Sequence, residues 1–224
     1  MTRQPQRQTV IVTGDDVASV FSAHLDDDYR LCMVACHQDV DDFRIAYVLL
    51  RPTDDRRVEL VLTVSQQERE IPSLALLDYS VGRFEREMRD LYGIRPIGHP
   101  LRRRLVRHGH WPVGWYPMLR QADPNPSFLD DVGSFPFLEV EGDGVYEIPV
   151  GPVHAGLIEP GHFRFSVVGE TILRMKARLW FVHRGVEKLF EGDCLLVGYG
   201  ITGWFVTLLA HCFGPRSWPL TPGP

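Results

Sequence analysis

A carboxylate and an imidazole lie three positions apart in the second half of the chain. Glu159 is followed by Pro160, Gly161 and His162, and a hairpin-like pattern comes next. A carboxyl group and an imidazole held close can relay protons, because their surroundings can tune both pKa values toward neutrality. We therefore predict Glu159 and His162 as candidate catalytic residues. The alternative is structural, with Glu159 capping the turn and His162 satisfying backbone groups.

A second cluster joins an acidic helix end to a basic strip. Glu85, Glu87 and Asp90 fall near the end of a helical pattern, and three consecutive arginines, residues 102–104, follow a turn with glycine and proline. We expect the carboxylates to pair with these arginines across the turn. Exposed pairs contribute about 0–1 kcal/mol each, so residue chemistry alone favours a solvated charged face.

The four cysteines are too few and too scattered for a disulfide framework, which indicates a reducing compartment. Cys32 and Cys36 are spaced to share one face of a strand, with His37 on the other face. No second pair completes a set of four ligands. We therefore predict free cysteines and no metal site.

Hydrophobic periodicity predicts the elements that position these residues. Three runs indicate strands: 29–37, 43–50 and 57–64. Helical spacing is found over 16–24 and over 72–92, where Gly93 is placed to end the helix. The fold class is α+β, with an antiparallel sheet covered by helices. The polar residues 1–9 are expected to be frayed.

Composition divides the chain into further parts. The α+β domain is expected over residues 1–108, and residues 109–143, with five prolines, are expected to form a linker. Its tryptophans, Trp111 and Trp115, indicate packing against a partner or, equally, against its own domain. Residues 144–193 are expected to hold a strand, a β-hairpin and the start of a helix, and so small a piece is marginal alone.

Residues 194–224 form a divergent apolar tail. Positions 194–214 contain no Asp, Glu, Lys or Arg. This stretch is long enough to span a bilayer as a helix, which needs about 20 apolar residues. Four glycines in this stretch lower its helix propensity. We expect a truncated or frame-disrupted gene product, and the alternative is a membrane anchor.

The composition is that of a soluble globular protein, at 44% hydrophobic and 24% charged residues. The net charge of -5 gives no indication of a nucleic-acid partner.

The stretch from Glu85 to Val106 follows a pattern that is longer and more specific than a solvated charged face would need. In order, and at fixed distances, it contains Glu-Arg-Glu, Asp, two apolar residues, His, Arg and two aliphatic residues. This closely resembles the signature of the thirty-kilodalton hydrophilic subunit of respiratory complex I and its hydrogenase relatives. The resemblance covers residues 10–110 and implies an α+β domain that binds no cofactor and docks between electron-transferring subunits. It implies this docking surface: Glu85, Glu87, Asp90, His99 and Arg103.

Residues 148–154, 159–165 and 183–188 carry a second resemblance. They are similar to the N-terminal stretch of the large subunit of membrane-bound [NiFe] hydrogenases and, more distantly, to the forty-nine-kilodalton quinone-site subunit of complex I. Formate hydrogenlyase-like proteins fuse the two regions in this order. The resemblance implies that Glu159 lies near a metal centre, and that His154 and His162 line a quinone pocket.

The chain departs from that second pattern in its cysteines. A [NiFe] site needs two pairs of thiolates, and the sequence has no Cys-x-x-Cys. We expect no cofactor bound by this chain alone, in a complex that contains iron–sulfur clusters and quinone or [NiFe].

The expected role is docking and scaffolding within an NADH:quinone oxidoreductase or energy-converting hydrogenase complex, peripheral on the cytoplasmic face of the inner membrane. The expected partners are the iron–sulfur small subunit, the remainder of the large subunit and membrane subunits, without nucleic acid. The alternatives are a catalytic-subunit fragment that supplies proton-relay or quinone-pocket residues, and a non-functional remnant.

Overall fold

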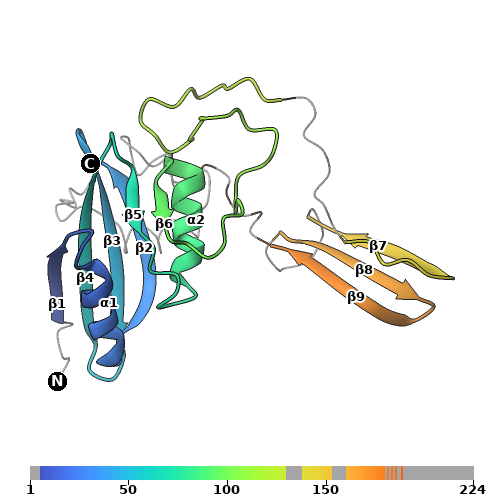
Figure 1. Ribbon diagram of the computed structural model, residues 1–224, viewed down its shortest axis with the longest axis horizontal. Coiled ribbons are helices and arrows are strands. Elements are labelled where there is room, and N and C mark those ends of the chain that lie inside the picture. Colours follow the sequence, from blue (N-terminus) through green and yellow to red (C-terminus); the bar gives the residue numbers. More distant parts are fainter. Residues whose placement is uncertain are drawn as a thin grey trace, which may run out of the picture. The chain divides into compact units, whose positions relative to one another are not determined.

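The computed structural model describes residues 6–129, 138–152 and 160–179, and also residues 181, 183, 185 and 188. The described elements, in chain order, are β1 (Gln6–Val12), α1 (Val17–Asp26), β2 (Arg30–Gln38), β3 (Asp42–Arg51), β4 (Arg56–Ser65), β5 (Glu70–Pro72), α2 (Val81–Tyr92), β6 (Arg95–Ile97), β7 (Val145–Val150), β8 (His162–Val168) and β9 (Thr171–Arg178) (Figure 1). This mixture of strands and helices confirms the α+β class.

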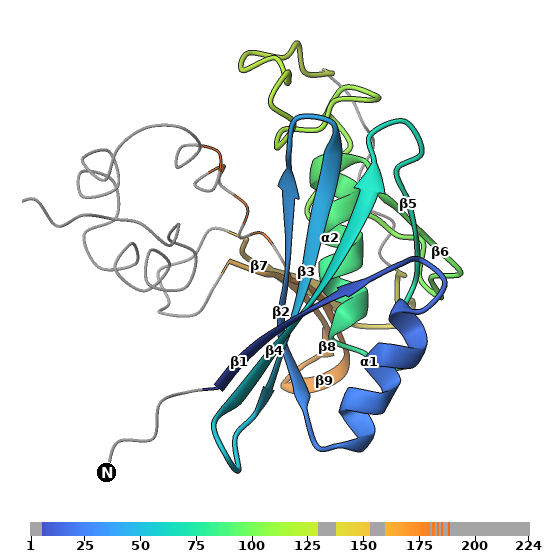
Figure 2. The same ribbon diagram turned by 90° about the vertical axis from the view of Figure 1, so that its left-hand side faces the viewer.

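The main sheet has the strand order β1-β4-β3-β2, and β3 runs antiparallel to both of its neighbours (Figure 2). Both helices pack on the same face of this sheet. The ring of Phe21 in α1 lies edge-on to Tyr47, with centroids 6.2 Å apart, and Tyr92 in α2 lies edge-on to Phe43 at 6.1 Å. Tyr47 and Phe43 are four residues apart on β3, so their side chains share one face. The core of the domain lies between this face and the helices.

The first strand corrects one expectation. Gln6–Val12 is not frayed but pairs with β4, and because the pairing is parallel the main sheet is mixed. Val12 is buried against the helices whereas its neighbour Ile11 is 73% exposed. An edge strand with polar residues on its open side gives a weak sequence signal, and pairing with β4 overrides it.

The second helix begins later than its periodicity predicts. Residues 72–80 end β5 and form turns, and α2 starts at Val81. Leu74 is fully buried there, which explains why its spacing suggested a helical face. The Asp78 carboxylate accepts the N–H of Ser80 at 2.6 Å and helps to form the turn before the helix. Gly93 ends the helix as expected, with a left-handed φ of 79°.

The expected linker starts inside the packed domain. Met118 and Leu119 belong to the same buried core as the sheet. The N–H of Met118 donates to the carbonyl of Leu91 at 3.2 Å, and the side-chain oxygen of Gln38 accepts the N–H of Arg120 at 2.7 Å. The domain therefore continues past residue 108, because this segment covers the end of α2.

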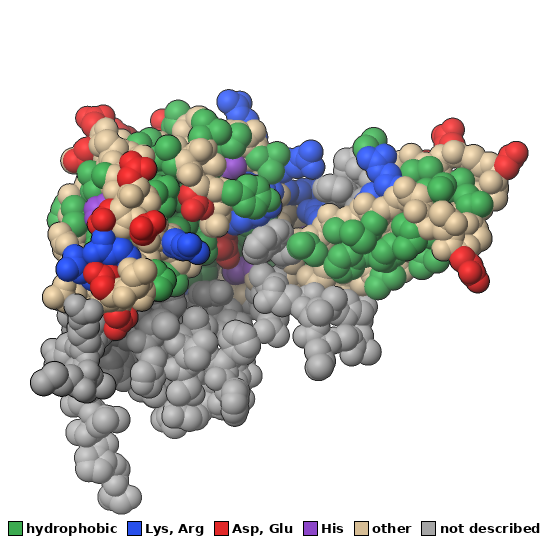
Figure 3. All heavy atoms as spheres, turned by 90° about the horizontal axis from the view of Figure 1, so that it is seen from below, with side chains coloured by type: hydrophobic (Ala, Val, Ile, Leu, Met, Phe, Trp, Pro, Cys, Tyr) green, Lys and Arg blue, Asp and Glu red, His purple; other side chains and the backbone are tan. Residues whose placement is uncertain are grey.

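Strands β7, β8 and β9 form a separate antiparallel sheet, which confirms the expected hairpin and adds a third strand to it. Its two faces differ in polarity. On one face Glu147 accepts hydrogen bonds from Arg164 at 3.1 Å and Lys176 at 2.6 Å. The register gives the other face apolar residues throughout: Tyr146, Ile148, Val150, Phe163, Phe165, Val167, Ile172, Met175 and Ala177. Figure 3 shows the hydrophobic side chains gathered on this sheet.

Within the described residues, no helix is both long and apolar enough to cross a bilayer. The tail at 194–224 lies outside the described residues, as does most of the helix expected from residue 183.

Tyr47 has a buried hydroxyl group with no hydrogen-bond partner among the residues that the structure describes. Burying an unpaired polar group costs about 1–3 kcal/mol. We therefore expect Tyr47→Phe to raise the free energy of unfolding by about 1 kcal/mol, as measured by urea denaturation. A variant that is less stable than the wild type would contradict the absence of a partner for this hydroxyl.

Candidate docking site

Two arginines of α2 hold the segment that carries the three consecutive arginines. Arg86 donates from Nε and Nη2 to the carbonyls of Arg103 and Arg104, at 2.8 and 2.9 Å. Arg89 donates from Nη1 and Nη2 to the carbonyls of Arg102 and Arg103, at 2.9 and 2.6 Å. Positions 86 and 89 lie on one side of the helix because they are three residues apart. We call residues 102–104 the arginine strip, and its three side chains are exposed.

Asp90 holds the residues that follow the strip. Its Oδ2 accepts the N–H groups of Leu105, Val106 and Arg107 at 2.6, 3.1 and 3.2 Å. Its Oδ1 pairs with Arg89 at 3.1 Å, and Asp90 is only 3% exposed. One buried carboxylate therefore satisfies three backbone donors and also pairs with the guanidinium that holds the strip.

Glu85 lies five residues before Asp90 on the same helix and is completely buried. Its two oxygens accept the Ser73 hydroxyl at 2.6 Å and the Leu74 N–H at 2.7 Å. Burial raises the pKa of Glu85 to about 7, against the opposing effect of these two hydrogen bonds. The Nε2 atom of His99 lies 3.7 Å away and contacts the Gly82 carbonyl at 3.1 Å. Burial lowers the pKa of His99, which favours its neutral form.

The structure separates the five expected docking residues by environment. Glu85 and Asp90 are buried, Glu87 and His99 are half-buried, and Arg103 is exposed. For Glu85 and Asp90, the expected pairing with the arginines across the turn is replaced by bonds to backbone groups. The physical reason is that a carboxylate inside the domain is stabilised better by N–H groups at fixed positions than by long, mobile side chains.

Sequence reasoning missed Arg86 and Arg89, which make the four bonds to the strip. The sequence signal that could have identified them is their place among the acidic residues of positions 85–90. It also missed Arg107, which donates to the Trp115 carbonyl at 2.8 Å and to the carbonyl of Pro112. Arg107 therefore fixes the loop that carries both tryptophans.

Comparison with protein families decides which fold family these residues belong to. The family described as respiratory-chain NADH dehydrogenase, 30 Kd subunit, matches residues 10–127. The chain belongs to this family. The matched range includes the whole main sheet except the start of β1, both helices and the arginine strip, and it ends near the point where packing on the domain ends.

Curated relatives carry hydrogenase and complex I names. Hydrogenase-4 component G of Escherichia coli is 41% identical over 57% of this chain, which is 24% of that protein. The C/D subunit of the NADH-quinone oxidoreductase of Bacteroides thetaiotaomicron is 33% identical over 66% of this chain and 31% of its own length. The chain therefore spans about a quarter to a third of the length of these two relatives.

A solved structure of an Nqo5 trypsin-resistant fragment matches 42% of this chain and 80% of that fragment, at 20% identity and a TM-score of 0.38.

The predicted proton-relay and quinone-pocket residues lie outside the 30 Kd family match. Glu159 and His154 are also outside the described residues. His162 begins β8 and is half-buried. Burial, with Arg164 and Arg178, lowers the pKa of His162 and favours a neutral imidazole.

The thiols of the 30 Kd domain are not arranged as a ligand set. A register shift between Leu31 and Met33 interrupts the strand alternation at Cys32, which is exposed, whereas Cys36 is half-buried. The pKa of the Cys36 thiol is raised by burial, which disfavours its metal-binding thiolate form. Over the described ranges, no three His, Cys, Asp or Glu side chains are grouped as metal ligands.

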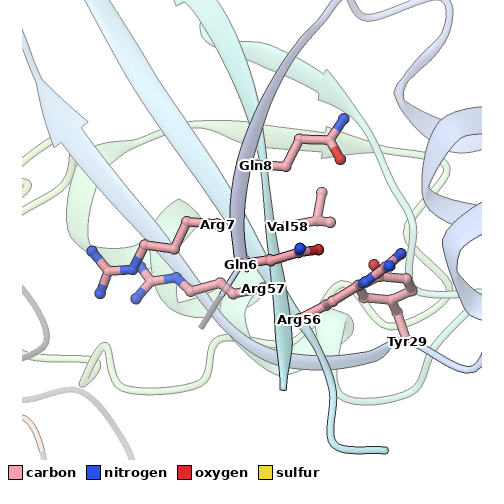
Figure 4. A pocket seen from close by; sticks show the side chains of 7 residues that line it. All are labelled: Gln6, Arg7, Gln8, Tyr29, Arg56, Arg57 and Val58. Carbon is pink, nitrogen blue, oxygen red and sulfur yellow. The ribbon is translucent and has the colours of Figure 1, made fainter. Parts of the chain in front are cut away.

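A polar recess lies at the start of the β1–β4 pair (Figure 4). Arg7 and Arg57 extend to one side of it, and Arg56 lies beside Tyr29 on the other. Arg56 pairs with Asp54 at 2.9 Å and Arg57 with Glu59 at 2.5 Å. These two arginines already have carboxylate partners within the domain, so the recess is a weaker candidate for ligand binding than the arginine strip is for docking.

Proposed function

We propose that this chain is a docking subunit of an NADH:quinone oxidoreductase or an energy-converting [NiFe] hydrogenase complex. It scaffolds the large subunit against the iron–sulfur small subunit, as a peripheral component on the cytoplasmic face of the inner membrane. The electron carriers of the complex, which are iron–sulfur clusters with quinone or [NiFe], reside in other polypeptides. The absence of any Cys-x-x-Cys from the sequence does not fit a [NiFe] site in this chain.

The observation that carries this proposal is that the charged residues of α2 bond backbone groups of neighbouring segments. The side chains of Asp90, Arg86 and Arg89 form hydrogen bonds to the backbone of residues 102–107. Glu85 likewise bonds the backbone of Leu74. Such residues fix the shape of an exposed segment, as a docking surface requires.

The apolar face of the β7–β8–β9 sheet supports the same role. Tyr146, Ile172 and Met175 are 51%, 59% and 58% exposed on it. A continuous apolar face of this kind is normally covered by another layer. The relatives are three to five times longer than the stretch they share with this chain. We assign the remainder of the large subunit as the layer that covers this face.

Charge on the apolar face is expected to weaken the complex. A lysine at Met175 would be buried without a partner, so we expect about a tenfold loss, or more, in the large-subunit protein that co-purifies with the tagged full chain. Thr171→Lys adds the same charge on the opposite, polar face of β9 and should leave the yield unchanged. Equal yields from the two variants would overturn the scaffolding role of this sheet.

A second candidate function rests on His162. A neutral, half-buried imidazole beside Arg164 and Arg178 is suited to accept a proton or to bond a quinone oxygen. In this alternative the chain is a catalytic-subunit fragment to which Glu159, His154 and His162 contribute. Loss of turnover by the assembled complex on His162→Ala, with every partner protein still present, would favour it.

A further inference from the structure

We propose that the arginine strip, residues 102–104, is a docking surface for a carboxylate-rich segment of a partner protein. This inference rests on the proposed function for the identity of the partner's complex, and it adds the chemistry of the contact. It is carried by three features of the strip: how its backbone is held, which charges surround it, and which of its atoms the fold leaves unused.

The backbone of the strip is fixed before any partner arrives. Four hydrogen bonds from Arg86 and Arg89 hold its three carbonyls, at 2.6 to 2.9 Å. Asp90 holds the next three N–H groups. A segment with six consecutive residues held in this way loses little backbone entropy on binding, which favours association.

Most of the charges near the strip are positive. The guanidiniums of Arg86 and Arg89 bond its backbone carbonyls, and burial with the charges of Arg83, Arg89 and Arg103 lowers the pKa of Arg86. Asp90 pairs with Arg89. Within the described part of the chain, no ion pair includes the side chains of the strip. Concentrating like charges is unfavourable in itself, and a partner's carboxylates would remove that cost.

Among the described residues, the carbonyls of the strip accept hydrogen bonds whereas its side chains make no ion pair. The three guanidinium groups are exposed and can each bond a carboxylate in the two-pronged geometry that arginine favours. Three arginines are fewer than the roughly 6–10 phosphate contacts of typical DNA-binding proteins. This small number favours an acidic protein segment over nucleic acid as the partner.

The role of the three side chains can be tested in the full chain, because the described part of the fold bonds only the backbone of the strip. Side-chain substitutions in the strip therefore leave these hydrogen bonds in place. The probe is a fluorescein-labelled poly-glutamate peptide of about ten residues, followed by fluorescence anisotropy at low salt. Arg103→Glu should weaken binding about tenfold, and the triple change of Arg102, Arg103 and Arg104 to Glu should abolish it. Raising the salt from about 20 to about 200 mM should weaken wild-type binding.

Arg30→Glu is the matched control, since Arg30 is an exposed arginine on β2 and carries the same charge change. It should alter peptide binding less than about twofold. Far-UV circular dichroism melting checks that each variant is folded. Arg103→Gln removes the charge without reversing it, and it decides the question if the triple variant does not fold.

Three results would overturn the proposal. The first is equal peptide binding by the wild type and the folded Arg103→Gln and Arg103→Glu variants. The second is an equal loss in Arg30→Glu. The third is tighter binding of duplex DNA or of phosphatidylglycerol vesicles through the same arginines. Failure of the proposed function gives a different result, in which the strip binds the peptide but the tagged chain co-purifies with no hydrogenase or complex I protein.

Discussion

Asp90→Ala is expected to lower the free energy of unfolding by about 3–5 kcal/mol, the range for breaking a buried charged pair. The carboxylate is almost completely buried and accepts three backbone N–H groups. Alanine would leave those donors unpaired next to two buried aliphatic residues, Leu105 and Val106. It would also remove the carboxylate that pairs with Arg89, which holds the arginine strip. Urea denaturation of the full chain, followed by tryptophan fluorescence, measures this loss.

Two variants separate the role of the oxygen atom from that of the charge. Asp90→Asn keeps one acceptor oxygen and loses the charge, so we expect a smaller loss of about 1–3 kcal/mol. Asp41→Ala removes an exposed carboxylate and should change stability by less than about 0.5 kcal/mol. If Asp90→Ala were as stable as Asp41→Ala, the N–H groups of residues 105–107 would have other partners.

The sequence predicts which residues lie near the candidate docking site better than it predicts which groups they bond. The spacing of Glu85, Asp90 and Arg103 resembled the family signature, and the family match over residues 10–127 confirms that resemblance. The predicted partners differed, because side-chain pairing was assumed where backbone groups are bonded. Which backbone groups face a helix depends on the path of the following loop, and local periodicity carries no information about that path.

The fold shows the same division. Strands β2, β3 and β4 and helix α1 lie where apolar spacing predicts them, within one or two residues at most ends. Strand β1 and the packing of Met118 and Leu119 depend on contacts with residues far away in the sequence. Polar edge strands and proline-rich segments look alike in sequence whether or not they are packed, so only the tertiary structure distinguishes them.

The two buried carboxylates of α2 have different hydrogen-bond partners, and the surroundings of Glu85 lead to the second large effect. Asp90 has three N–H donors and a guanidinium around it, whereas Glu85 has one hydroxyl, one N–H and a histidine with a lowered pKa. The stabilising contacts of Glu85 are too few to offset its burial. Its pKa of about 7 means that the folded domain holds a proton on Glu85 that an unfolded chain releases near pH 4.5.

Because the folded state binds more protons between pH 4.5 and 7, Glu85 contributes stability that is complete below pH 4.5 and is lost as the pH rises through 7. A difference of this size corresponds to about 3 kcal/mol. Glu85→Gln should remove this dependence, because a neutral amide can accept the Leu74 N–H and donate to the Ser73 hydroxyl. We therefore expect the variant to unfold at a higher urea concentration than the wild type at pH 8, and at a similar or lower one at pH 5.

The difference between the two proteins at each pH isolates Glu85 from the other titrating groups. His99 acts in the opposite direction, because its lowered pKa makes the unfolded chain bind more protons as the pH falls below about 6.5. Subtracting the Glu85→Gln curve from the wild-type curve removes the part of the His99 contribution that both proteins share. A difference that stays constant from pH 5 to pH 8 would mean that Glu85 is ionised throughout this range, and that bonds to Ser73 and Leu74 outweigh its burial.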